Sequence, residues 1–160
     1  MRRGRTLLAV AALGLAQPAQ AACIDAPTAS AARLHEFETM MMAVSLRCAR
    51  VGVDMRADYD TMVTTYRTQF EAAGARLQAF FAALDGKRKG AGYDRYSTLL
   101  ANRYGGGQTT GEACGLLAGV TREVIKAREG AKVLLAVAEA MIARSALEAA
   151  TCPAVASARR

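Results

Sequence analysis

Apolar residues recur in this chain at alternating steps of three and four, the spacing that places side chains on one face of an α-helix. The first such stripe ends just before Gly52, a residue type that readily terminates helices. Its members are Leu34, Phe37, Met41, Val44, Cys48 and Val51. A second stripe covers residues 55–84 and predicts one continuous helix. No stretch shows the sustained alternation of period two that a half-buried strand requires.

Three further helices are predicted from the same spacing, over residues 94–103, 109–125 and 133–147. Short connections between long amphipathic helices favour antiparallel packing. We therefore expect an all-α fold, an antiparallel helical bundle of four main helices plus one short helix. Residues 22–160 are expected to form a single helical domain with frayed tails at 22–29 and 153–160.

Residues 1–21 have the organisation of a secretory signal peptide. A positive start with three arginines is followed by an uncharged apolar run at 6–15 and by small residues before a cleavage site after Ala21. The apolar run is too short to span a bilayer and to remain as an anchor. We therefore predict cleavage near Ala21 and a periplasmic or secreted protein.

The four cysteines are expected to form two disulfides, because an even number in an exported chain indicates oxidised pairs. Cys48 and Cys114 lie on predicted apolar helix faces, whereas Cys23 and Cys152 lie in the flanking tails. Of the pairings that four cysteines allow, we favour Cys48 with Cys114 and Cys23 with Cys152. Lipidation of Cys23 is an alternative, although Gln20 stands where a lipoprotein signal has a large aliphatic residue.

The formal net charge is +7, and three of the positive charges belong to the arginines of residues 1–21. On an exported protein, a mild positive charge favours anionic envelope surfaces or acidic partners over nucleic acid. Lys87, Arg88 and Lys89 are candidates for weak contact with an anionic surface, although a solvated loop is the simpler explanation. Charged residues interrupt the apolar segment 131–150, so no transmembrane segment is expected in the mature chain.

Residues 93–107 form the predicted partner-binding segment, because tyrosines and arginines concentrate there before three consecutive glycines. Tyrosine and arginine offer flat apolar area together with hydrogen-bond donors, which suits an envelope protein or a glycan. A glycine run also exposes backbone N–H groups that attract anions. The candidate residues are Tyr93, Arg95, Tyr96, Asn102, Arg103, Tyr104, Gly105 and Gly106. The structural alternative is a helix whose tyrosines pack on the bundle.

A small-ligand, metal or haem carrier is the first alternative function. His35, Glu38 and Met42 share one helix face at steps of three and four. Histidine and methionine are ligands of copper and of haem iron. The structural alternative is that the methionines fill the core, which is their commoner role.

A peptidoglycan-active hydrolase is the second alternative, because such enzymes need paired carboxylates across a cleft. Glu36 with Glu38, and Asp54 with Asp58 and Asp60, supply carboxylates, but their spacing is typical of helix starts and solvated faces. The single histidine has no recognisable nucleophile motif beside it. We therefore predict a non-enzymatic binding protein, with no catalytic residue and no cofactor.

Three short stretches, residues 40–48, 93–98 and 104–107, read MMMAVSLRC, YDRYST and YGGG. They resemble the corresponding parts of small exported helical proteins of alphaproteobacteria. The resemblance implies a helical, cysteine-bearing envelope protein. It implies no activity and no site residue.

Overall fold

The computed structural model describes residues 24–86 and 90–151, and every regular element within them is an α-helix. The helices are α1 (Ala26–Arg50), α2 (Arg56–Thr65), α3 (Arg67–Asp85), α4 (Ala91–Gly105), α5 (Gly111–Lys126), α6 (Gly130–Met141) and α7 (Ala146–Thr151). The predicted all-α class is confirmed. None of these helices is both long and apolar enough to cross a membrane.

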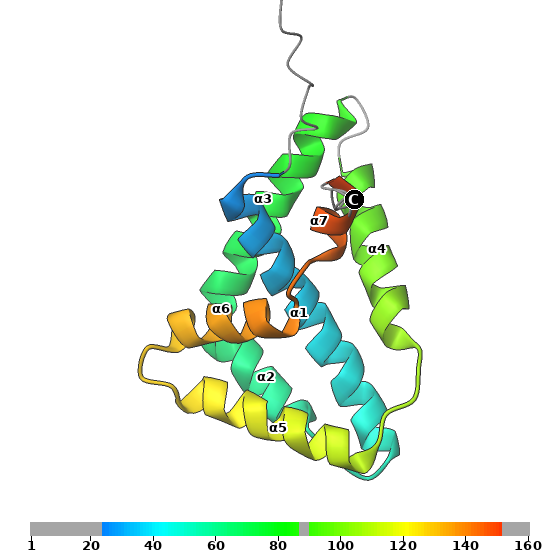
Figure 1. Cartoon of the computed structure of the whole chain (residues 1–160), viewed down its shortest axis with the longest axis vertical. Helices are drawn as coiled ribbons and strands as arrows, with labels where there is room; N and C mark the ends of the chain where they lie inside the picture. The colour runs from blue at the N-terminus through cyan, green and yellow to red at the C-terminus, as the bar shows by residue number, and fades with distance from the viewer. Residues whose placement is uncertain (1–23, 87–89, 152–160) are drawn as a thin grey trace, which may run out of the picture.

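The helices form two groups that cross each other (Figure 1). One group consists of α1, α3 and α4, which run along the long axis of the molecule in alternating directions. The other is the antiparallel pair α5 and α6, which lies across them, and α7 then turns back beside α4. Within these groups α3 runs antiparallel to α1 and α6 antiparallel to α5, whereas α4 runs in the same direction as α1, and the two groups do not share one bundle axis.

The central helix is α1, which contacts each of the other helices. It begins at Ala26, because the Asp25 carboxylate accepts a hydrogen bond of 2.8 Å from the Thr28 N–H and Pro27 occupies the first turn. The helix therefore starts inside the segment 22–29 that was expected to be a frayed tail. It ends at Arg50, two residues before Gly52, whose φ of 83° suits a chain reversal.

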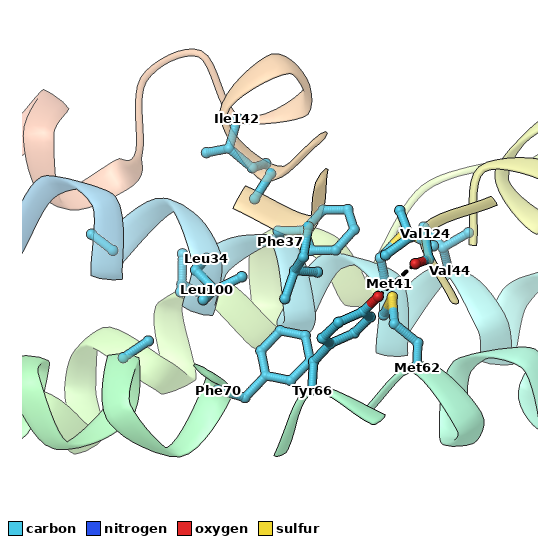
Figure 2. Close-up of a cluster of buried hydrophobic side chains, with 14 of the residues drawn as sticks. Leu34, Phe37, Met41, Val44, Met62, Tyr66, Phe70, Leu100, Val124 and Ile142 are labelled. Atoms are coloured by element: carbon cyan, nitrogen blue, oxygen red, sulfur yellow. Dashed lines mark hydrogen bonds between the residues drawn. The ribbon is translucent and has the colours of Figure 1, made fainter. Parts of the chain in front are cut away.

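The core lies where α1 meets the junction of α2 and α3. Phe37 and Met41 of α1 are fully buried and lie beside Tyr66 and Phe70 (Figure 2). Side chains from α5 and from the end of α6 close the same cluster. The predicted first stripe is buried except for Val51, so the apolar period identified the inner face of α1.

The predicted continuous helix over residues 55–84 is wrong, because α2 and α3 are separate helices that meet at Tyr66. Tyr66 leaves helical geometry with φ −110° and ψ 26°. Its buried hydroxyl donates a hydrogen bond of 2.6 Å to the Val124 carbonyl oxygen of α5. This long-range contact holds Tyr66 at the break, and the apolar period of the sequence carries no signal of it.

The predicted helix over residues 133–147 is also divided, into α6 and α7. Ser145 and Glu148 cap the start of α7 reciprocally: Ser145 Oγ accepts from the Glu148 N–H at 3.1 Å, and Glu148 Oε2 accepts from the Ser145 N–H at 2.8 Å. Glu148 Oε2 also accepts a hydrogen bond of 2.9 Å from Arg33 Nε. These contacts begin a new helix at Ala146 and fasten it to α1.

Cys48 of α1 and Cys114 of α5 form a disulfide with their Cα atoms 5.6 Å apart, which confirms the predicted pair. The bond joins the end of α1 to the beginning of α5, one helix from each group. Several other expectations fall outside the described residues: the Cys23–Cys152 pair, the signal peptide 1–21, the basic residues Lys87, Arg88 and Lys89, and the tail 153–160.

Candidate functional site

The predicted binding segment, residues 93–107, consists of most of α4 and the glycine loop that follows it. Tyr96 and Leu100 face inward and are buried, while Tyr93 and Tyr104 are half-buried at the edges. The exposed residues of the outer side are Asp94, Arg95, Thr98, Leu99, Asn102 and Arg103. The predicted residues are therefore divided between the core and the surface.

Tyr96 belongs to the core. Its ring centroid lies 5.4 Å from that of Phe81 in α3 and 6.1 Å from that of His35 in α1. Burial raises the pKa of Tyr96 well above its ordinary value, and its hydroxyl finds no hydrogen-bond partner among the described residues. A buried hydroxyl without a hydrogen-bond partner costs free energy. The Tyr96 hydroxyl is such a group, and it lies beneath the surface of α4.

Tyr104 is held by Glu36, a fully buried carboxylate of α1, so the prediction that Glu36 is a solvated acid is wrong. The Tyr104 hydroxyl donates to Glu36 Oε1 at 2.6 Å, and the Ala146 N–H donates to Oε2 at 2.7 Å. Arg103 Nη1 lies 3.6 Å from Oε1. Burial, followed by the hydrogen bond to Glu36, raises the pKa of Tyr104 to about 12. Glu36 thus joins α1, α4 and α7, and the role of Tyr104 is structural.

The glycine loop is organised around Arg47 of α1. Arg47 Nη1 donates a hydrogen bond to the Gly106 carbonyl oxygen. Gly107 has a φ of +96°, and a Cβ at that position would lie 3.3 Å from Arg47 Nη1. The loop therefore presents a carbonyl oxygen to the guanidinium of Arg47. Glycine is needed at position 107 so that the backbone can pass close to Arg47 before α5 begins.

An apolar groove lies between α3, α4 and α7. It has a volume of about 420 Å³, and Phe81, Leu84, Leu99 and Leu147 provide most of its apolar surface. Leu84 and Leu99 are 67% and 53% exposed, which is a high exposure for two leucines that line the same groove. Tyr96 and the exposed Arg95 also line it, so the predicted segment supplies one wall of this groove.

A second, more polar cleft lies on the other side of α4, against α1 and α3. It combines His35, Glu38 and Tyr93, which belong to two different predicted sites. His35 Nδ1 lies 4.0 Å from Glu38 Oε2, and the rings of His35 and Tyr93 are 5.7 Å apart. Burial lowers the pKa of His35 and raises the pKa of Glu38.

Met42, the third residue of the predicted metal or haem set, does not line this cleft and is 40% exposed. The structure therefore brings His35 and Glu38 together but leaves Met42 apart from them. Over residues 24–86 and 90–151, no group of three or more histidine, cysteine or acidic side chains is arranged to hold a metal ion.

Comparison with known proteins adds no family to this description, because no protein-family model, curated protein or solved structure matches the chain. The features that bear on function are therefore α4 itself, the apolar groove and the polar cleft.

Proposed function

We propose that this protein is an exported, non-enzymatic binding protein of the cell envelope, and that its partner docks on the outer side of α4 and in the groove between α3, α4 and α7. The observation that carries the proposal is the pair of exposed leucines, Leu84 and Leu99, on either side of that groove. Apolar surface of this kind on a small helical protein is typical of an interaction site.

The polar groups of the groove indicate which charge the partner should carry. Asp85 accepts a hydrogen bond of 2.7 Å from the Gly92 N–H, so its carboxylate is already used at the start of α4. Arg95 is exposed and forms no ion pair or hydrogen bond with another described side chain. The groove therefore suits a protein segment that places apolar side chains against the leucines and a carboxylate against Arg95.

The inner face of α4 anchors the helix to its neighbours, while its outer face remains exposed to a partner. Tyr96, Leu100 and Tyr104 anchor the helix to α1 and α3, so its outer residues are presented on a rigid element. A rigid binding surface loses less conformational entropy on association than a mobile loop does.

Site-specific photo-crosslinking in intact cells tests the docking surface. A photoreactive residue at Leu99 is expected to capture a specific envelope protein. Leu116, an exposed leucine of α5 that is 69% exposed and does not line the groove, is the matched control and should capture nothing above background. Equal capture at both positions, or capture of a second copy of this chain alone, would contradict the proposal.

Export is tested separately by N-terminal sequencing of the protein purified from its native envelope. The proposal predicts a mature chain that begins at Ala22. Recovery of the intact chain, beginning at Met1, from the cytosolic fraction would contradict it.

A further inference from the structure

The polar cleft beside His35 has the properties of a small-molecule site that is distinct from the groove. Its volume is about 490 Å³, and it lies between α1, α3 and α4. Phe70 and Gly74 of α3 contribute an apolar floor, and a Cβ at Gly74 would lie 3.6 Å from the Tyr93 hydroxyl. Concave sites with an apolar floor and a few convergent polar groups are the usual form of ligand pockets.

Several polar side chains of this cleft have no partner within the part of the chain that the structure describes, although His35 Nε2 lies 3.5 Å from Ser97 Oγ. Arg67, Glu71 and Gln78 of α3 line the cleft without a hydrogen bond or an ion pair. Glu38 has only the 4.0 Å contact with His35, and burial lowers the pKa of His35, which disfavours the charged imidazolium that would pair with Glu38. Most of the other half-buried or buried acids that the structure describes lie beside an arginine, and Asp85 instead accepts a hydrogen bond from the Gly92 N–H.

Three of those other acids form ion pairs. Glu36, Glu148 and Asp58 each lie within 4.0 Å of an arginine, at 3.6 Å, 2.5 Å and 3.0 Å respectively. Glu38 is half-buried like these three acids but has no arginine beside it, whereas Glu71, the second carboxylate of the cleft, is exposed. A carboxylate kept partly desolvated without a cation costs free energy, which a cationic ligand would recover.

The order of the groups along the cleft follows from the antiparallel course of α1 and α3 (Figure 1). Glu38 follows His35 in α1, and Arg67 and Glu71 precede Gly74 and Gln78 in α3. Opposite charges therefore gather at one end of the cleft, namely Glu38, Glu71 and Arg67. The other end holds neutral donors and acceptors on His35, Gln78 and Tyr93.

We propose that this cleft binds a small zwitterion, an amino acid or a short peptide with a free α-ammonium and a free carboxylate. Glu38 and Glu71 accept hydrogen bonds from the ammonium, and Arg67 donates to the carboxylate. The side chain of the ligand lies over Gly74, toward Tyr93.

The single histidine of the chain provides a direct readout, because its ring proton gives one assignable NMR signal from inside the cleft. The probe is the dipeptide Ala-Ala, titrated into the purified, oxidised protein. Two capped forms are the matched controls: N-acetyl-Ala-Ala lacks the ammonium, and Ala-Ala amide lacks the carboxylate. We expect a saturable shift of the His35 signal with Ala-Ala, and dissociation constants raised at least about tenfold for each capped form.

Two variants at Gly74 test the location without removing a polar group. Gly74→Leu fills the cleft and is expected to abolish the shift, whereas Gly74→Ala makes only an ordinary contact with Tyr93 and should retain it. Both replace a helical glycine with a better helix former, so loss of binding cannot be attributed to a weaker helix. Glu38→Gln is expected to weaken Ala-Ala binding at least about tenfold and to leave the weak binding of N-acetyl-Ala-Ala unchanged.

Three outcomes would overturn the proposal. One is the absence of any saturable shift with Ala-Ala. Another is equal affinity for Ala-Ala and N-acetyl-Ala-Ala, which would show that the ammonium is not recognised. The third is unchanged binding in Gly74→Leu, which would place the peptide elsewhere. None of these outcomes affects the docking surface at Leu99, which lines the separate groove.

Discussion

At the scale of single residues, Glu36 is the side chain on which the position of α4 and α7 most depends. Replacement by leucine would leave the Tyr104 hydroxyl and the Ala146 N–H without their acceptor. We expect Glu36→Leu to lower the free energy of unfolding by about 3 kcal/mol, because buried donors left without acceptors carry their full desolvation cost. Urea denaturation followed by circular dichroism measures this change.

Tyr104→Phe is the matched control, because it removes one donor and leaves the Ala146 N–H paired with Glu36. It should cost about 1 kcal/mol. A Glu36→Leu variant as stable as the wild type would show that the carboxylate does not hold the three helices together.

Glu148 gives the stability of the protein a defined response to acid. The hydrogen bond from Arg33, followed by the bonds from Ser145, lowers the pKa of Glu148 from 4.5 to about 2. A carboxyl group whose pKa is depressed by folding stabilises the fold above its unfolded pKa and loses that contribution as the pH falls through the folded pKa. The contribution is therefore complete above pH 4.5 and declines toward pH 2.

The difference in unfolding free energy between wild type and Glu148→Gln isolates this effect from other carboxyl groups. We expect a constant difference in favour of the wild type from pH 7 down to about 5, which then shrinks as the pH falls further. Chemical denaturation at a series of pH values measures it. If the stability difference between wild type and Glu148→Gln grows as the pH falls, the pKa of Glu148 is not lowered by folding.

At the scale of helices, the packing of α6 against the α2–α3 junction depends on the absence of a side chain at Gly130. A Cβ there would lie 2.4 Å from the Tyr66 hydroxyl, which is hydrogen-bonded to the Val124 carbonyl. We expect Gly130→Ala to destabilise the protein by about 2 kcal/mol through overpacking, despite the better helix propensity of alanine. Thermal and urea denaturation both measure this loss.

Gly119→Ala in α5 is the control, since a Cβ at Gly119 has nothing within 4 Å. It should be neutral or stabilise the protein by up to about 1 kcal/mol. If the two variants behave alike, the contact between Tyr66 and Gly130 is not a constraint on the fold.

The sequence predicted where helices lie better than where they break. The stripe from Leu34 to Cys48 is buried in α1, because the apolar period reports which face meets the core. The break at Tyr66 depends on a hydrogen bond to α5, which no local pattern contains. The start of α7 was within reach of sequence reasoning, because Ser145 and Glu148 have the spacing of a capping box.

At the scale of the whole molecule, the Cys48–Cys114 disulfide ties the two crossing groups of helices together. The bridged residues are 66 apart in the sequence, and closing a loop of that length stabilises the fold by about 4 kcal/mol in the chain-entropy model. We expect the Cys48→Ala, Cys114→Ala double variant to lose stability of that order in urea denaturation. A double variant with an unchanged midpoint would show that helix packing alone sets the stability.

The candidate site could be predicted from the sequence only in part. Tyrosines and arginines marked α4 as unusual, but composition does not distinguish a buried ring such as Tyr96 from an exposed group such as Arg95. The groove itself depends on Leu84, near the end of α3, and on Leu147 of α7, which lies far from α4 in the sequence. Its lining could therefore be identified only after the three helices had been placed together.

The most direct test of the proposed function is the affinity of the captured envelope partner for matched variants of the purified protein, measured by isothermal titration calorimetry. Leu99→Ala and Arg95→Ala are each predicted to weaken binding by about tenfold or more, because both side chains lie in the groove. Leu116→Ala, on α5, is predicted to bind as the wild type does. Wild-type affinity in the Leu99 and Arg95 variants, or an equal loss in all three, would contradict the assignment of this face of α4 as the docking surface.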